Sequence, residues 1–204
     1  DAGLDARAGR LAKPLAAGDV SPASVRTAFV VAALLCVPFS LALGLLPAVL
    51  HLVVVAAGWS YDLWLKRTAA SPLPYFVAFG LLPLVAWGAA GAPLELPLAL
   101  AAGMLGVAAH FANTVPDAVA DAVTGVRGLP QRLGPHRSQR VAALGVVLAC
   151  ALPLVATRLP LPAISLLTAA AAVGVGSAVA AAHLSFRLTL VAAALAVAGV
   201  VVAG

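Results

Sequence analysis

Charged residues are scarce in this chain of 204 residues. Asp, Glu, Lys and Arg make up 9% of the sequence, against 63% hydrophobic residues, and the mean hydropathy is +1.10. A soluble domain is about a quarter charged. Because a soluble protein wets its surface with charge, the shortage excludes a soluble globular domain and indicates a surface that faces lipid.

Charges are absent altogether from long stretches of the chain. None occurs in 27–61, 68–94, 96–116, 141–157, 159–186 or 188–204. Crossing the bilayer takes roughly 20 apolar residues, so the first stretch is too long for one crossing, and Gly44 and Pro47 can divide it into two helices. We therefore predict an all-α polytopic membrane bundle with seven spans, near 23–43, 47–63, 72–89, 96–115, 138–157, 161–182 and 187–203.

Cysteine is also rare. The only two cysteines, Cys36 and Cys150, fall inside apolar spans, and no CxxC pattern occurs. This excludes a cysteine-based metal or redox motif. We expect both side chains to be small buried apolar groups.

The basic residues lie in short loops between the predicted spans. The formal charge of +5 can suggest nucleic acid, but membrane topology explains the positions better. If seven spans alternate, only Arg158 lies on one side. The other eleven lie opposite: Arg7, Arg10, Lys13, Arg26, Lys66, Arg67, Arg127, Arg132, Arg137, Arg140 and Arg187. By the positive-inside rule, the loops at 62–71 and 114–137 face the cytoplasm of a multi-pass protein in the inner membrane.

Two segments of the chain match each other without a gap when residue 1 is set against residue 117. Each leads into an apolar span, and together they contain four of the six aspartates. We interpret them as equivalent cytoplasmic loops of two pseudo-symmetric halves. Asp1, Asp5, Ala6, Gly9, Pro14 and Gly18 match Asp117, Asp121, Ala122, Gly125, Pro130 and Gly134.

Each matched segment carries a D-x-x-x-D pair. Residues four apart lie on one helix face, about 5–6 Å from each other, so two ionised carboxylates repel unless a cation joins them. Mg²⁺ suits this arrangement because it takes oxygen ligands and often pairs carboxylates with substrate phosphates. The alternative is that the aspartates are exposed caps or turn residues. Two pairs beside the ends of spans favour a functional site, because acidic residues are costly there.

The residues before Asp117 extend this pattern. His110, Asn113 or Thr114, Asp117 and Asp121 recur at three- and four-residue steps. They form one polar stripe if the helix of the fourth span continues past Pro116. Asn113 could then supply a carbonyl ligand to the metal. His110 is equally explained as a buried histidine that a neighbouring helix satisfies.

The segment from Tyr61 to Thr68 is rich in aromatic and basic residues. Tyr, Trp, Lys and Arg all favour the membrane interface, so Trp64 and Arg67 are explained equally well as interface residues. Lys66 is a better candidate for a diphosphate contact, as a point charge for a phosphate oxygen. Other cations follow the aspartate pairs and could act similarly: Arg10, Lys13 and Arg127.

These motifs together resemble the UbiA family of intramembrane prenyltransferases over essentially the whole chain. The segment from Asn113 to Gly134 is similar to that family's second aspartate-rich motif, and Asp1 to Gly18 is similar to the latter part of its first motif. Tyr61 to Lys66, followed by Ser71-Pro72-Leu73-Pro74-Tyr75, is similar to its Tyr–Lys loop.

The resemblance implies a single transmembrane domain over residues 1–204 with an active site open to the cytoplasm. Mg²⁺ would join a polyprenyl diphosphate to both motifs, and the prenyl group would pass to an apolar, usually aromatic, acceptor. Nucleic acid is not an expected partner. The implied metal ligands are Asp1, Asp5, Asn113, Asp117 and Asp121. The implied catalytic residues are Asp117, Asp121, Lys66 and Tyr61, and the implied diphosphate contacts are Arg10, Lys13, Lys66, Arg67 and Arg127.

The chain departs from the family pattern in several places. The family has nine helices, and the two before the first motif, with the Asn and leading Asp of that motif, are absent. We therefore expect a chain truncated at its amino end, inactive until about two upstream spans are restored. Four residues separate Tyr61 from Lys66, where some members have three, and Thr114 stands where an Asp is possible.

Two other functions remain open on the sequence. A UbiA-type terpene cyclase would ionise the same diphosphate but quench the cation within one substrate. A carrier is a different class, because internal repeats also mark transporters. The polar residues here cluster at one membrane face, whereas a transporter would place them near the midplane.

Overall fold

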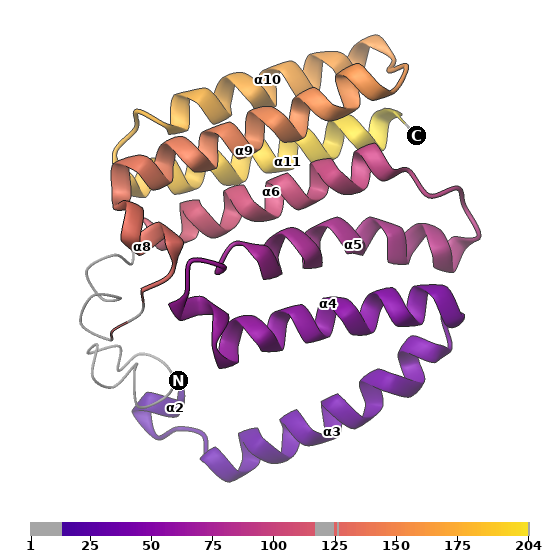
Figure 1. Ribbon diagram of the computed structural model, residues 1–204, viewed down its shortest axis with the longest axis vertical. Helices are drawn as coiled ribbons and strands as arrows, with labels where there is room; N and C mark the ends of the chain where they lie inside the picture. Colours follow the sequence, from indigo (N-terminus) through magenta and orange to yellow (C-terminus); the bar gives the residue numbers. More distant parts are fainter. Residues whose placement is uncertain (1–13, 117–124, 126, 204) are drawn as a thin grey trace.

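The protein is entirely helical in the residues that its computed structural model describes, which are 14–116, 125 and 127–203. Figure 1 shows long helices side by side, running in alternate directions from α3 to α11. The elements are α2 (Pro14–Ala17), α3 (Pro22–Leu41), α4 (Leu45–Leu63), η1 (Leu65–Arg67), α5 (Leu73–Ala90), α6 (Leu96–Thr114), α8 (Leu129–Leu133), α9 (Pro135–Ala156), α10 (Leu161–Ser177) and α11 (Ala182–Ala203).

Each predicted span corresponds to one long helix, so the prediction of a polytopic helical membrane protein is confirmed. Six of the described helices are long and apolar enough to cross a membrane, and α10 is a shorter apolar helix of 17 residues. The division of the first apolar stretch is also correct. Gly44 precedes α4 with a φ of 101°, a conformation that glycine adopts without strain.

Three predicted boundaries are wrong: the start of α9, the end of α10 and the start of α11. α9 begins at Pro135 instead of 138, since proline suits the first helical turn and Gly134, with a φ of 80°, directs the chain into it. The helix predicted to reach 182 ends at Ser177, next to the poor helix former Gly176. Arg187, predicted in a loop, consequently lies in the second turn of α11.

The fourth span also ends earlier than the predicted polar stripe requires. α6 ends at Thr114, and the Val115 N–H bonds to the carbonyl of Ala112. Pro116 has no N–H with which to continue the ladder. Of the stripe, Asp117 and Asp121 lie outside the described residues.

One end of the bundle carries most of the loops with basic residues. The left end in Figure 1 gathers the start of α3, the connection from α4 to α5, the connection from α6 to α9, and the turn from α10 to α11. Arg158, between α9 and α10, belongs to the opposite end. The described basic residues therefore keep the one-sided distribution that the sequence predicts.

Small residues let the central helices approach closely. A Cβ built at Gly106 would lie 2.5 Å from the carbonyl oxygen of Tyr75, and one at Gly174 would lie 2.6 Å from the Val146 side chain. α6 packs against α5 and α9 and also contacts α11, and α10 packs against α9 and α11. Close backbone approach through small residues is typical of helix packing in lipid. The contacts of α6 with α5, α9 and α11 place this helix, which leads to the second aspartate pair, at the centre of the bundle.

α3 lies at the edge of the bundle. It packs chiefly on α4, and Figure 1 shows its first turns splayed away from that helix. In the most apolar stretch of α3 only 6% of the residues are buried inside the protein, against 44% in that of α6.

Candidate functional site

The connection from α4 to α5 forms a structured loop at the end of the bundle. We call residues 64–72 the lysine loop; it contains the 3-10 helix η1, with Lys66 and Arg67 in its last turn. The Lys66 side chain is only 11% exposed, and its Nζ lies 3.7 Å from an Asp62 carboxylate oxygen that is one turn earlier. The surrounding chain limits the movement of a side chain that is largely buried. Lys66 can therefore hold its positive charge in one place and present it to an anion.

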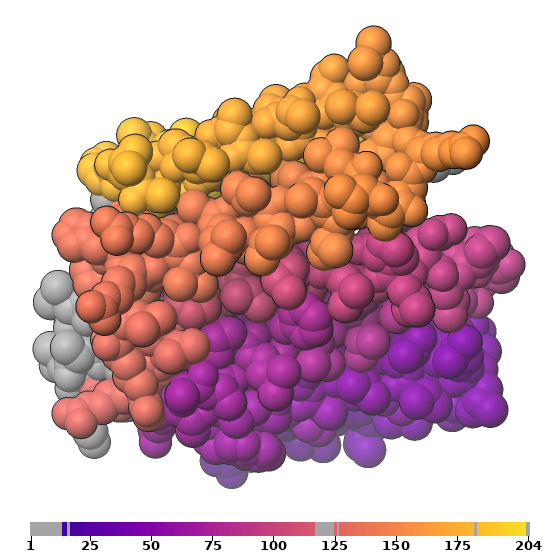
Figure 2. All heavy atoms as spheres, turned by 45° about the horizontal axis from the view of Figure 1, so that its top comes forward, coloured from indigo at the N-terminus to yellow at the C-terminus, as the bar shows by residue number. Residues whose placement is uncertain are grey.

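The segment that returns from the second aspartate pair lies against the lysine loop. We call residues 127–134, which include α8, the return segment. A Cβ at Gly128 would lie 2.8 Å from the backbone oxygen of Lys66. In Figure 2 the salmon atoms of α8 and early α9 lie directly beside the purple atoms near the start of α5. The two segments are thus in backbone contact.

Arg132 spans the two segments. Its Nε donates to the carbonyl of Arg127 at 2.9 Å, and its terminal NH2 group donates to the carbonyl of Arg67 at 3.5 Å. Arg67 and Arg127, two of the predicted diphosphate contacts, are both exposed at this end. Arg132 therefore brings the backbones of two predicted cationic contacts together.

A cluster of rings lies beneath the lysine loop. Tyr61 from α4 meets His110 from α6 at a ring-centroid distance of 5.6 Å, and Tyr75 from α5 meets His110 at 4.6 Å. His110 is 2% exposed, and its Nε2 lies 3.1 Å from the hydroxyl of Ser71. His110 is therefore a buried histidine whose ring has one hydrogen-bond partner among the described residues, the Ser71 hydroxyl of the lysine loop.

A cavity of about 310 Å³ opens beside these rings, between the end of α4 and the start of α5. Its wall is mostly apolar and aromatic, with the Asp62 carboxylate near the lysine loop. Such a wall suits a hydrocarbon chain or an aromatic ring next to one polar group. The lining residues are Gly58, Tyr61, Asp62, Pro74, Tyr75, Ala78 and Phe79.

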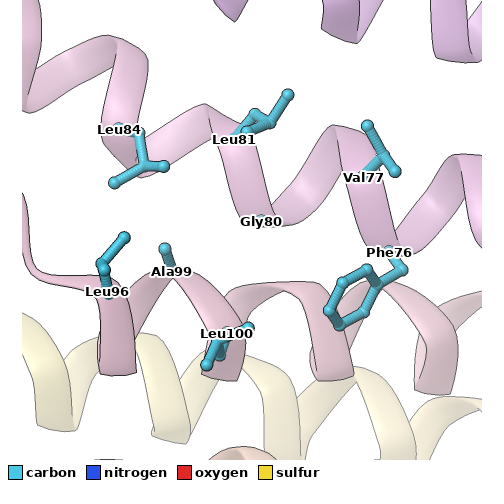
Figure 3. Close-up of a pocket in the computed structure, with 8 residues that line it drawn as sticks. All are labelled: Phe76, Val77, Gly80, Leu81, Leu84, Leu96, Ala99 and Leu100. Carbon is cyan, nitrogen blue, oxygen red and sulfur yellow. The ribbon is translucent and has the colours of Figure 1, made fainter.

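A second cavity, of about 190 Å³, lies between α5 and α6. Figure 3 shows Phe76 and Leu84 of α5 pointing toward α6, where Leu96 and Ala99 point back toward α5. Phe76 and Gly80 line this cavity, whereas Tyr75 and Phe79 line the first, and residues one position apart point about 100° away from each other on a helix. The second cavity therefore opens on another face of α5 and carries no polar side chain.

A comparison with models of protein families identifies the family of this chain. The model of the UbiA prenyltransferase family matches residues 1–192. The chain belongs to the UbiA prenyltransferase family. No curated protein and no solved structure matches it. Family membership confirms the resemblance to this family and supports an intramembrane prenyltransferase in a multi-pass helical protein.

The described residues include about half of the predicted site. Tyr61 lies in the last turn of α4, Lys66 and Arg67 in η1, Asn113 exposed in the last turn of α6, and Arg127 in the return segment. The predicted residues outside the described part are Asp1, Asp5, Arg10, Lys13, Asp117 and Asp121.

The described part offers one of the predicted metal ligands. Asn113 presents an amide at the end of α6, and an amide oxygen is a donor that Mg²⁺ accepts. Among residues 14–116, 125 and 127–203, no group of three or more His, Cys, Asp or Glu could hold a metal ion. That search does not reach the four motif aspartates, so the fit of Mg²⁺ rests on donor chemistry: Asn113 and four carboxylates are all oxygen donors.

Sequence reasoning missed three residues that organise this end of the bundle: Ser71, Gly128 and Arg132. The signals that the sequence offered were the run Gly128-Leu129-Pro130 at the start of α8 and the step Ser71-Pro72 before the start of α5. The Asp62–Lys66 ion pair was readable, because an acidic residue four positions before a basic one is a standard helical pair.

Proposed function

We propose that this protein transfers a prenyl group from a polyprenyl diphosphate to an apolar, aromatic acceptor within the membrane, in a single transmembrane domain over residues 1–204. Family membership supports prenyl transfer in general. The observation that carries the proposal is the largely buried side chain of Lys66, which lies beside the return segment that follows the second aspartate pair.

In this proposal the cations and the aspartates divide the work on the diphosphate. Lys66, Arg67 and Arg127 contact its oxygens, as do Arg10 and Lys13. Asn113 and the aspartates Asp1, Asp5, Asp117 and Asp121 hold Mg²⁺, which when bound neutralises the charge that develops on the departing diphosphate.

The reaction breaks the bond from the allylic carbon to the diphosphate oxygen, and the diphosphate leaves with the electron pair. A bond then forms to a carbon of the acceptor ring, and that carbon loses its proton to the departed diphosphate. Tyr61 and Tyr75 line the cavity next to Lys66. Their rings exclude water from the neighbourhood of the allylic cation, which water would otherwise capture.

The proposed orientation places the lysine loop and the return segment in the cytoplasm of an inner-membrane protein. The one-sided basic residues support this orientation through the positive-inside rule.

The test is prenyl transfer by the purified protein, produced from its complete gene, in liposomes with a radiolabelled polyprenyl diphosphate, Mg²⁺ and an aromatic acceptor. We expect acceptor-dependent product that EDTA abolishes. Asp117→Asn and Asp121→Asn should each lower turnover at least about a hundredfold, while Asp19→Asn, an exposed aspartate outside both motifs, should leave it unchanged.

The variants should remain folded, because removing one of two like charges does not destabilise a pair without its metal. Near-normal activity in either motif variant would return the pair to the interpretation of helix-end caps. Product that forms without any acceptor would indicate a cyclase instead.

A further inference from the structure

Ser71 is the buried polar residue at which three segments of the bundle meet. Its side chain is 0% exposed. The hydroxyl oxygen accepts the Leu129 N–H at 3.0 Å and lies 3.1 Å from Nε2 of His110. One oxygen atom therefore joins the lysine loop, the first residue of α8 and the central helix α6.

The hydrogen-bonding capacity of a serine accounts for both contacts. A hydroxyl has one proton and two lone pairs, and the Leu129 N–H occupies one lone pair. The contact with His110 then forms in either tautomer, with Ser71 donating to Nε2 or Nε2–H donating to Ser71. Nδ1 of His110 is buried without a hydrogen-bond partner among the described residues, so Ser71 is the polar contact that orients this ring.

The glycine before Leu129 brings the same two segments into contact. At Gly128 a Cβ would lie 2.8 Å from the Ser71 hydroxyl oxygen and 2.8 Å from the carbonyl oxygen of Lys66. Any side chain there would push the return segment away from the lysine loop. The Arg132 bonds to the carbonyls of Arg67 and Arg127 join these segments a second time, from the exposed side.

We propose that Ser71 is a positioning residue that fixes the separation between Lys66 of the lysine loop and Arg127 of the return segment. Lys66 is five residues before Ser71 along the chain, and Arg127 is two residues before Leu129. The inference rests on the proposed function, because it assigns the fixed separation to binding one diphosphate from both sides. Ser71 touches neither substrate nor metal in this account.

The consequence is a specific kinetic effect. Without the hydroxyl, the lysine loop and the return segment separate, and the two halves of the diphosphate site no longer match one ligand. A displacement of about 1 Å can cost about a hundredfold in rate. We expect Ser71→Ala to raise KM for the prenyl diphosphate and the half-saturating Mg²⁺ concentration by roughly tenfold or more, with little change in KM for the acceptor. Ser71→Thr, which keeps the hydroxyl, should recover much of the loss.

A spin-label distance measurement tests the same idea without activity. The labels are placed at Ala69→Cys and Arg127→Cys, both exposed positions, in a Cys36→Ala, Cys150→Ala background. Pulsed electron paramagnetic resonance should give a narrow distance distribution that broadens in Ser71→Ala. Ser165→Ala is the matched control, because Ser165 is exposed and its hydroxyl donates to the carbonyl of Leu161 within the same helix, α10.

Arg132→Ala keeps the test decisive if Ser71→Ala does not fold. Arg132 is exposed, so its removal spares the core. Arg132→Ala should raise KM for the prenyl diphosphate and the half-saturating Mg²⁺ concentration by about two- to threefold. Arg140→Ala, which removes an exposed arginine of α9, should leave both unchanged.

The outcomes separate this inference from the proposed function. An active parent protein whose distance distribution and Mg²⁺ dependence are unchanged by Ser71→Ala and Arg132→Ala would overturn the role of Ser71 and leave prenyl transfer intact. A parent protein without prenyl transfer, whose distance distribution nevertheless broadens in Ser71→Ala, would overturn the proposed function and keep Ser71 as the residue that joins the two segments.

Discussion

Lys66 and Asp62 form an ion pair between a buried and an exposed side chain: Nζ lies 3.7 Å from Oδ1, and the side chains are 11% and 71% exposed. Because the carboxylate is in water, the pair is screened and contributes less than about 1 kcal/mol. Lys66 is the less exposed partner and the pair with Asp62 is weak, so we expect the function of Lys66 not to depend on Asp62.

The first prediction follows from this asymmetry. Lys66→Gln should weaken binding of a prenyl diphosphate roughly ten- to hundredfold, because a hydrogen bond to a charged group contributes about 1.5–3 kcal/mol. Asp62→Asn should change binding less than about threefold. Isothermal titration with a non-hydrolysable prenyl diphosphate analogue and Mg²⁺ measures both. Equal losses in the two variants would show that the ion pair, and not the ammonium, is what binding requires.

The sequence predicted the number and order of the spans, because a long stretch without charged residues crosses the membrane as a helix. It could not place α9 and α11 accurately, since the decision between loop and helix at Pro135 and Gly176 depends on local turn geometry. Tyr61 and Lys66 were identified through a motif. Ser71 was not identified as a site residue, because its contact with His110 joins positions 39 residues apart and has no periodic signal.

The second prediction concerns the close contact of α5 and α6. Gly106→Ala would place a Cβ 2.5 Å from the carbonyl oxygen of Tyr75 and 2.7 Å from Cβ of Phe79. Backbone cannot yield as a flexible side chain can, so we expect a loss of about 1–3 kcal/mol in the free energy of unfolding. Unfolding by sodium dodecyl sulfate in mixed micelles measures it.

Gly176→Ala is the matched control for Gly106→Ala. It also lies in a long helix, and a Cβ there would meet nothing within 4 Å. It should be neutral or slightly stabilising, since alanine is the better helix former. If both variants unfold alike, close packing at Gly106 does not limit stability.

The third prediction concerns orientation in the membrane. In a protein without Cys36 and Cys150, a cysteine at Glu95 should react with a membrane-impermeant maleimide added to intact cells. A cysteine at Arg127 should react only after permeabilisation. Both positions are exposed and lie at opposite ends of the bundle. The reverse pattern would refute the cytoplasmic placement of the return segment.

The fourth prediction concerns how α3 is attached. The Ser40 hydroxyl donates to the carbonyl of Cys36 at 2.6 Å, and its oxygen lies 2.8 Å from Nδ1 of His51 on α4. Since the serine proton is already committed, His51 donates through Nδ1–H. This hydrogen bond joins α3 to α4 where apolar contacts are few.

A double-mutant cycle with Ser40→Ala and His51→Ala should therefore give a coupling energy of about 0.6 kcal/mol, and at most about 1.7 kcal/mol.

The fluorescence of Trp59 reports on the docking of α3, because the Trp59 ring lies 5.6 Å from that of Phe29. Trp64 and Trp87 are replaced by Phe so that Trp59 is the sole tryptophan. Pairing Ser165→Ala with His51→Ala should give no coupling, because Ser165 is on α10 and its hydroxyl donates to the carbonyl of Leu161 in the same helix. Each single variant should release α3 from α4 at a lower detergent concentration than the parent does, and the double variant should lose little more than either. Strictly additive losses would mean that apolar packing alone attaches α3, and that the hydroxyl and the imidazole act independently.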